Sequence, residues 1–195
     1  MNKYLSKLWE ISQKKERFII GLMSGTSLDG LDVALCRVKG TGSDTVIEVL
    51  QFVTEEYEPD LRERLVAIQS REQIDTRELT RLHSELGIWY GRIIKEKIEG
   101  WGMNIEAIDL IASHGQTVYH APAVRKDELN ATLQVVDGDH IAQESGIITM
   151  SAFCQKQTAA GGDGAPLAGI FDDVLSRHVT KKRMVLNVGV MESFH

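Results

Sequence analysis

The stretch Gly21-Leu-Met-Ser-Gly-Thr-Ser-Leu-Asp-Gly-Leu-Asp32 lies between two apolar runs, residues 18–22 and 31–38. Two such runs, joined by a short segment rich in Gly, Ser and Asp, predict two strands connected by a tight polar loop. We expect Gly25 and Gly30 to turn the backbone with positive φ and to let a ligand approach it closely.

The polar residues of this loop are those that a phosphate site needs. Ser24, Thr26 and Ser27 carry hydroxyls, and successive backbone N–H groups in such a loop can form an anion-binding nest. Asp29 and Asp32 add hard oxygen ligands suited to Mg²⁺, directly or through water. Composition alone fits an ordinary hairpin equally well, because Gly, Ser and Asp mark turns in many proteins.

Strands and helices alternate along the rest of the chain, which predicts an α/β fold in one domain. Further strands are expected at residues 46–53, 108–112, 131–136, 147–150 and 184–188. Helices are expected from Pro59 onward and at residues 75–100, 137–144 and 166–178. Residues 1–17 read as a short helical or frayed extension, and residues 153–164 as a loop.

Composition excludes several classes of protein. The chain has 195 residues, of which 43% are apolar and 26% charged, as is ordinary for a soluble globular protein. The net charge of −6 argues against a nucleic-acid or anionic-membrane partner, because no basic face offers counterion release. No apolar run approaches transmembrane length. Cys36 and Cys154 lack CxxC or metal-ligand spacing, so we expect a reduced, cytoplasmic protein.

A second polar motif, Ser113-His-Gly-Gln-Thr117, follows the expected strand at residues 108–112. Open α/β sheets place ligands at the carboxyl ends of their strands. His114 and Gln116 can both donate and accept hydrogen bonds, which suits a polyhydroxylated substrate. The other interpretation is a polar turn in which backbone groups satisfy His114.

Two further segments offer groups to a ligand. Gln134, on the expected strand at residues 131–136, is either a polar contact or a strand-surface residue. Gly161 and Gly162 belong to Ala159-Ala-Gly-Gly-Asp-Gly-Ala-Pro-Leu167, which precedes an expected helix. Glycines before a helix N-terminus favour an anion or a close ligand approach. They also serve simply to let two chain segments cross.

The order of residues in these motifs resembles the anhydro-N-acetylmuramic acid kinases, bacterial sugar kinases of the actin/hexokinase-like superfamily. The resemblance rests on residues 21–32, on residues 113–117 with the following Val118-Tyr-His-Ala-Pro122, and on residues 159–167. The first loop is not a Walker loop, because no Gly-Lys-Ser/Thr follows its glycines. The resemblance implies a ribonuclease H-like, actin/hexokinase-type lobe, with a mixed sheet, initial antiparallel strands and flanking helices.

The resemblance also implies site residues and ligands. The expected ligands are ATP, Mg²⁺ and a small amino sugar. The phosphates of ATP would lie on Gly25, Thr26, Ser27, Leu28, Asp29, Gly30, Leu31 and Asp32, with Mg²⁺ at Asp29. The amino sugar would contact His114, Gln116, Thr117, Gln134, Gly161 and Gly162. The implied reaction opens the ring of 1,6-anhydro-N-acetylmuramic acid with water and phosphorylates O6, a step of peptidoglycan recycling in the cytoplasm.

The chain departs from the family pattern in two places. Residues 151–157 replace a stretch rich in Asp, Phe and Arg, and Ala152, Cys154 and Gln157 stand where the family has an acid, a base and another polar group. Residues 190–195 do not continue the family's Leu-Asn-Ile-Gly-Gly block. The family's catalytic Asp lies in an Asp-Thr-Gly-Pro-Gly-Asn block without a match here, so no catalytic residue is assigned.

We therefore expect an extension at residues 1–17 and an N-terminal kinase lobe at residues 18–195, truncated before the second lobe. A non-catalytic ligand-binding lobe, a truncated inactive copy and a generic α/β nucleotide-binding protein are the alternatives. A lone lobe would expose the apolar surface that faces its partner lobe, so we expect self-association, with a homodimer among the forms to test for.

Overall fold

The computed structural model describes residues 2–125 and 127–164, and every structural statement below refers to these residues. The expected helix at 166–178 and strand at 184–188 lie outside them. The strands are β1 (Glu16–Ser24), β2 (Gly30–Lys39), β3 (Val46–Glu56), β4 (Leu110–Ala121), β5 (Ala131–Val135) and β6 (Thr149–Met150). The helices are α1 (Lys3–Gln13), α2 (Pro59–Ile68), α3 (Thr76–Gly100), α4 (Gly138–Ser145) and α5 (Phe153–Ala159), with 3₁₀ turns η1 (Gly42–Asp44) and η2 (Ile105–Ala107).

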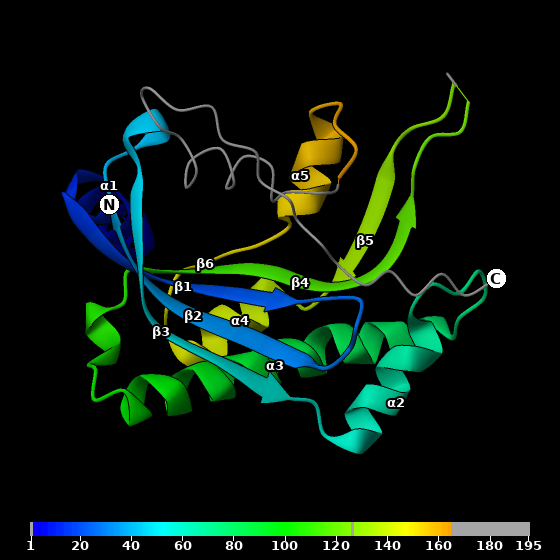
Figure 1. Ribbon diagram of the computed structural model, residues 1–195, viewed down its shortest axis with the longest axis horizontal. Helices are drawn as coiled ribbons and strands as arrows, with labels where there is room; N and C mark the ends of the chain where they lie inside the picture. The colour runs from blue at the N-terminus through cyan, green and yellow to red at the C-terminus, as the bar shows by residue number, and fades with distance from the viewer. Residues whose placement is uncertain (1, 126, 165–195) are drawn as a thin grey trace, which may run out of the picture.

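The strands form one mixed sheet in the order β3-β2-β1-β4-β5, with β6 beside the first part of β4 (Figure 1). The first three strands are antiparallel, β4 runs parallel to β1 and β6, and β5 is antiparallel to β4. The α/β fold and its mixed sheet are thus confirmed. Beyond the body of the sheet, β4 and β5 continue as a two-stranded arm (Figure 1).

The main hydrophobic core lies between the sheet and helices α2, α3 and α4, which cover one side of the strands, while α5 lies on the other (Figure 1). Helix α3 begins at Asp75, whose side chain accepts hydrogen bonds from two backbone N–H groups, as expected from a capping residue. The helix ends at Gly100, as expected, and Gly102, which follows the C-cap residue Trp101, takes the left-handed φ of +67°. Fully buried members of the core are Ile20, Leu31, Val33, Leu35, Leu65, Leu82, Leu86, Tyr90, Ile94, Ile108, Ile111 and Ile141.

Two glycines of α3 allow α4 to pack very close to it. A Cβ atom on Gly87 would lie 2.6 Å from the carbonyl oxygen of Asp137, and one on Gly91 would lie 2.6 Å from Cβ of Glu144. The backbone N–H of Asp137 also donates to the carbonyl of His83, at 2.9 Å. Together these contacts fix where the N-terminus of α4 lies relative to the sheet.

Two expectations about local structure are wrong. The motif at residues 113–117 does not follow a strand but lies within β4, because Gly115 adopts a φ of +80° and the strand continues beyond this irregularity. Residues 153–159 form α5 instead of a loop, since the helix-breaking glycines start only at Gly161. The expected strand at 147–150 is also reduced to β6.

Candidate functional site

The loop between β1 and β2 turns through an unexpected residue. Gly25 and Gly30 do not have positive φ; Leu28 does, at +53°. The buried Leu28 side chain and the hydrogen bond from Arg62 Nε to the Leu28 carbonyl, at 2.9 Å, hold this conformation. Gly30 is required for another reason, because a Cβ there would lie 2.3 Å from the backbone oxygen of Glu55 on β3. The expectation of two left-handed glycines is therefore wrong, whereas the tight loop itself is confirmed.

The exposed side of this loop carries the polar groups predicted to bind phosphate. Thr26, Ser27 and Asp29 are exposed, and Ser27 Oγ donates to Asp29 Oδ1 at 2.7 Å. Asp32 is partly buried and accepts a hydrogen bond from Thr54 Oγ1 at 2.6 Å. The loop thus offers two hydroxyls and one carboxylate to solvent, and phosphate binding by them stays a prediction.

A magnesium ion would fit this loop only with ligands from outside the protein. Asp29 is the one exposed carboxylate of the loop, since Asp32 is bonded to Thr54 and Leu31 is a core residue. Within residues 2–125 and 127–164 no three His, Cys, Asp or Glu side chains could share a metal ion. Mg²⁺ commonly keeps several waters and binds one or two carboxylates plus substrate phosphates, so Asp29 suffices as its protein ligand.

A buried network of hydrogen bonds supports the loop from beneath. The Ser24 hydroxyl lies 2.7 Å from the Tyr57 hydroxyl and donates to the side-chain oxygen of Gln116, and the Tyr57 hydroxyl lies 3.0 Å from that of Tyr90. The Gln116 amide donates to the carbonyl of Gly25 in the loop at 3.1 Å. Burial raises the pKa of both phenols, so they remain neutral hydrogen-bonding groups.

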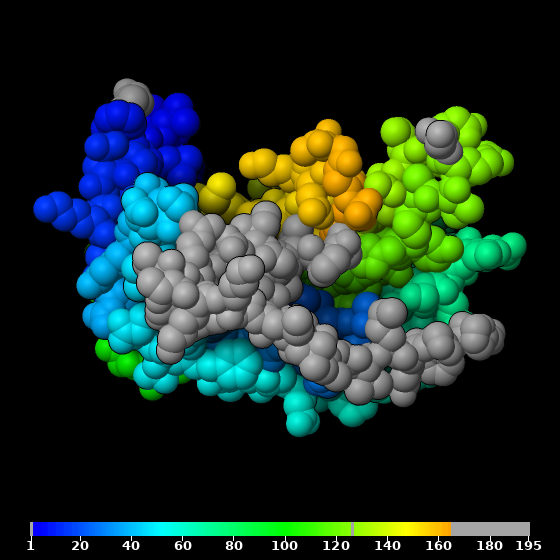
Figure 2. Space-filling view, turned by 45° about the horizontal axis from the view of Figure 1, so that its top comes forward, coloured from blue at the N-terminus to red at the C-terminus, as the bar shows by residue number. Residues whose placement is uncertain are grey.

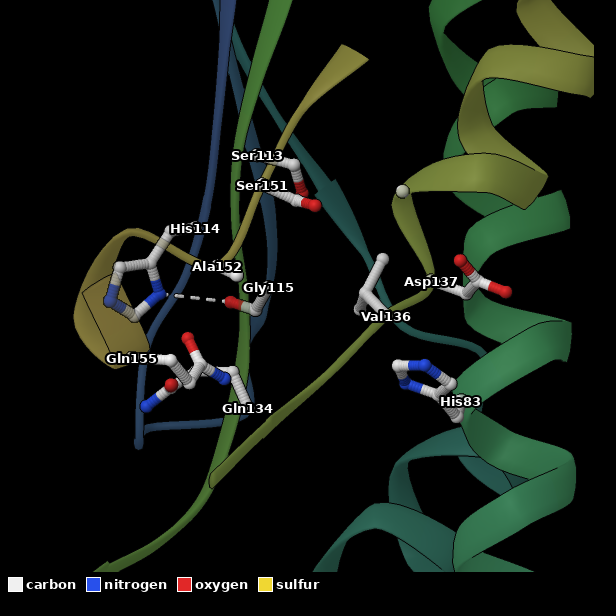
Figure 3. Close-up of a pocket in the computed structure, with 11 residues that line it drawn as sticks. His83, Ser113, His114, Gly115, Gln134, Val136, Asp137, Ser151, Ala152 and Gln155 are labelled. Carbon is white, nitrogen blue, oxygen red and sulfur yellow. Dashed lines mark hydrogen bonds between the residues drawn. The ribbon is translucent and has the colours of Figure 1, made fainter. Parts of the chain in front are cut away.

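A pocket of about 220 Å³ lies between β4, the end of β5, the N-terminus of α4 and the start of α5 (Figure 3). Its lining residues are His83, Ser113, His114, Gly115, Gln134, Val136, Asp137, Gly138, Ser151, Ala152 and Gln155. Figure 3 shows His114, Gln134 and Gln155 on one side of the pocket and His83 and Asp137 on the opposite side.

The structure brings only some of the predicted sugar-binding residues together. His114 and Gln134 both line the pocket, and Thr117 lies behind Gln134, whose Nε2 is 3.4 Å from Thr117 Oγ1. Gln116 is elsewhere, with its amide turned beneath the hairpin loop. Sugar contacts from these four residues remain predictions. A contact from Gln116 would require its amide to give up the hydrogen bond to the Gly25 carbonyl.

Gly161 and Gly162 do not line the pocket but belong to the turn after α5. Asn130 Nδ2 donates to the carbonyl of Gly162 at 3.3 Å and to Asp163 at 2.9 Å, which attaches this turn to the arm. In the space-filling view α5 lies against the arm, whereas α1 stands apart at the other end (Figure 2). Sugar binding by the two glycines stays a prediction.

His114 is held by contacts at both ring nitrogens. Its Nδ1 lies 3.0 Å from the carbonyl oxygen of Gly115, and its Nε2 lies 3.3 Å from Sγ of Cys154 on α5. A proton on Nδ1 satisfies the carbonyl and leaves Nε2 to accept from the thiol. Burial raises the pKa of Cys154, which favours the protonated thiol that this arrangement needs.

Sequence reasoning missed several pocket residues. His83 was not singled out as a ligand, yet it faces the pocket from α3 (Figure 3). Ser151 and Gln155 were not singled out as ligands, because they lie in the stretch that departs from the family pattern. No local signal marks these residues, since only the packing of α3, α4 and α5 around β4 brings them together.

No helix in the described part of the chain is both long enough and apolar enough to span a membrane.

Comparison with known proteins identifies relatives over nearly the whole sequence. The family model for anhydro-N-acetylmuramic acid kinase matches residues 17–194.

Two relatives of that name come from Pseudoalteromonas atlantica and Pseudoalteromonas translucida, each 43% identical over 97% of this chain and 48% of their own length. A third, from Bacillus cereus, is 36% identical over 88% of this chain and 45% of its own length. The chain thus spans about half the length of the curated relatives it matches. The match over residues 17–194 shows that this chain belongs to the anhydro-N-acetylmuramic acid kinase family.

Proposed function

We propose that this chain supplies the phosphate loop and one wall of the sugar cleft of an ATP-dependent kinase acting on 1,6-anhydro-N-acetylmuramic acid. The reaction would open the anhydro ring with water and transfer the γ-phosphoryl group to O6, in the cytoplasmic recycling of peptidoglycan. ATP and Mg²⁺ are the proposed cofactors, and Mg²⁺ would neutralise phosphate charge beside Asp29.

One observation supports this proposal above the others: a single strand reaches both candidate sites. On β4, Gln116 pairs with Ser24 and supports the hairpin loop, while His114, two residues earlier, lines the pocket. The strand that supports the phosphate loop thus also contributes to the proposed sugar pocket, which favours one shared cleft for the two ligands.

The described residues would bind and orient the ligands. Thr26 would donate a hydroxyl hydrogen bond to a phosphate oxygen, Ser27 would do so in exchange for its hydrogen bond to Asp29, and Asp29 would hold Mg²⁺. The buried network beneath the loop fixes its shape before ATP arrives, so little reorganisation is needed on binding. No group of this chain is assigned as the general base.

Calorimetric titration of the full chain with ATP and Mg²⁺ tests the proposal. We expect Asp29→Asn to weaken binding about tenfold, because one charged metal ligand is lost. Asp44→Asn, the same substitution at an exposed carboxylate in η1, is the matched control and should change nothing.

The second measurement is titration with the anhydro sugar, followed by mass spectrometry of the sugar after incubation with ATP. A product heavier by one water and one phosphoryl group would establish turnover by this chain. Absence of binding to both ligands, or ATP binding that ignores Asp29→Asn, would contradict the proposal.

A further inference from the structure

Three residues that line the pocket each carry a buried polar atom without a hydrogen-bond partner in the described part of the chain: Ser113 Oγ, Gln134 Oε1 and Gln155 Oε1. They come from β4, β5 and α5, and Ser113 is 0% and Gln134 6% exposed. Leaving such an atom unpaired costs about 1–3 kcal/mol. Three such atoms on residues that line one cavity therefore indicate a place where a polar ligand, or the water that it displaces, completes the hydrogen bonding once these side chains turn toward it.

The chemistry of these atoms limits what the ligand can be. The amide nitrogen of Gln134 already donates to Thr132 Oγ1 at 2.7 Å, so its oxygen is the end left for a ligand. The unpaired atom of Gln155 is also a carbonyl oxygen, and carbonyl oxygens only accept. The ligand must therefore bring N–H or O–H donors, while the Ser113 hydroxyl is able to donate to a carbonyl in return.

The lining is unsuited to an anion. Among the described residues it contains no Lys or Arg, and its one carboxylate, Asp137, carries negative charge on the side where His83 also lies (Figure 3). His114 has both ring nitrogens engaged with Gly115 and Cys154. A ligand carboxylate placed here would lose its hydration and face acceptor oxygens, which is strongly unfavourable.

Apolar groups complete the pocket. Val136 and Ala152 line it beside the unpaired oxygens, and both have left-handed backbones, with φ of +100° and +62°. For a β-branched residue such as Val136 this conformation is a rare outlier of the kind found at ligand sites. The cavity, at about 220 Å³, is several times the volume of one water molecule, about 30 Å³. This is room for a substituent of a sugar with a small apolar end.

Resting on the proposed function, we infer that this pocket binds the acetamido group of the amino sugar and that the lactyl carboxylate lies outside it. The amide N–H would donate to a glutamine oxygen, the amide carbonyl would accept from Ser113, and the methyl group would contact Val136. The pocket is thus a specificity element for N-acetylated sugars that gives no preference for the acidic side chain.

Saturation-transfer NMR on the full chain tests this directly, because 1,6-anhydro-N-acetylmuramic acid carries one acetamido methyl and one lactyl methyl. We expect the stronger saturation at the acetamido methyl. A stronger lactyl signal would overturn the inference while leaving sugar binding, and hence the proposed function, intact. Absence of any sugar signal, with ATP binding retained, would instead remove the sugar assignment of the proposed function and the inference with it.

Helix α5 provides a matched pair of variants for the same question. Gln155 and Gln157 each have a buried, unpaired Oε1, but only Gln155 lines the pocket. We expect Gln155→Leu to weaken sugar binding about five- to tenfold, the equivalent of one hydrogen bond, and Gln157→Leu to change it less than twofold. Equal effects of the two substitutions would overturn the inference, and the NMR measurement on the unaltered chain does not depend on either variant folding.

Discussion

Beneath the hairpin loop, Ser24, Tyr57 and Gln116 are hydrogen-bonded to one another, whereas in the pocket Ser113 and Gln134 each leave an oxygen without a partner. Both regions draw on the same strand, β4, and both are buried. The difference is that the protein itself determines the shape of the loop, while the described residues of the pocket leave hydrogen-bonding groups that a ligand can pair.

This contrast suits two kinds of ligand. A phosphate group is recognised by shape and charge, so a loop that is rigid before binding avoids the cost of reorganisation. An acetamido group is recognised by the pairing of individual donors and acceptors, so unpaired groups in the free protein are what select it. Substitutions in the two regions should therefore differ in size and even in sign.

The largest expected effect is at Gly30. In Gly30→Ala the new Cβ would lie 2.3 Å from the backbone oxygen of Glu55, so β2 and β3 must separate locally. We expect a loss of about 3 kcal/mol in the free energy of unfolding, measured by urea titration. Gly25→Ala is the control from the same loop, since its nearest neighbour is Ser27 Oγ at 3.6 Å. Equal stabilities of the two variants would show that the hairpin is not held against β3.

The next test concerns Gln116, which supports the loop between β1 and β2 through hydrogen bonds within the protein. Gln116→Leu would leave the Gly25 carbonyl and the Ser24 and Tyr57 hydroxyls without the amide, at a cost of about 2 kcal/mol. Thermal unfolding by circular dichroism measures this loss, and Gln51→Leu on exposed β3 should change stability little. A Gln116→Leu variant as stable as the Gln51→Leu control would mean that the network does not support the loop.

Two serines give the sharpest form of the comparison, because the same substitution should act in opposite directions. Ser24→Ala removes bonded contacts and should cost about 1 kcal/mol. Ser113→Ala removes an unpaired buried hydroxyl, so stability should stay the same or rise by up to about 1 kcal/mol. Urea titrations of both variants measure the difference, and losses of equal size would contradict the distinction between the two regions.

Much of the architecture could be predicted from local patterns. Two apolar runs joined by a Gly/Ser/Asp loop predicted the first hairpin, and the helix expected at residues 75–100 agrees with α3, because these features depend on neighbours in the sequence. The side-chain direction of Gln116 could not be predicted in this way. Residues 114 and 116 of a regular strand face the same side, but Gly115 with its φ of +80° interrupts the alternation.

As a result His114 contacts Cys154 of α5 on one side of the sheet, while Gln116 contacts Tyr57 next to α3 on the other. The partners of Gln116 and of the pocket residues also lie far away in the sequence; Ser24 and Gln116 are 92 residues apart. These contacts between residues far apart in the sequence depend on the register of β1 with β4 and on the close packing of α4 on α3. Neither leaves a local signal that a single sequence reveals.

The smallest expected effect concerns the side of the pocket at the N-terminus of α4. There the carboxylate of Asp137 is fully hydrogen-bonded within the protein. Asp137 Oδ1 accepts from the backbone N–H of Asp139 at 2.9 Å, and Oδ2 accepts from Nδ1 of His140 at 2.6 Å. Burial raises the pKa of this carboxyl, but the hydrogen bonds outweigh burial and hold the pKa below its ordinary value. A carboxyl with a lowered pKa in the folded state stabilises the protein above its unfolded-state pKa, about 3.9, and this stabilisation is lost as the pH falls through the lower folded-state value.

Asp137→Asn keeps a good helix cap and removes the charge. The wild-type chain should therefore be the more stable of the two at pH 7, by less than about 1 kcal/mol because the group is partly exposed, and the difference should close below about pH 4. Urea midpoints at pH 7, 5, 4 and 3 measure it, and in a His140→Ala background the difference should shrink at pH 7, since one of the two bonds is gone. A stability difference between the two chains that widens as the pH falls would mean that the Asp137 carboxylate is not stabilised in the folded state. Asp137 would then resemble Ser113 and Gln134, whose polar atoms have no partner in the described structure.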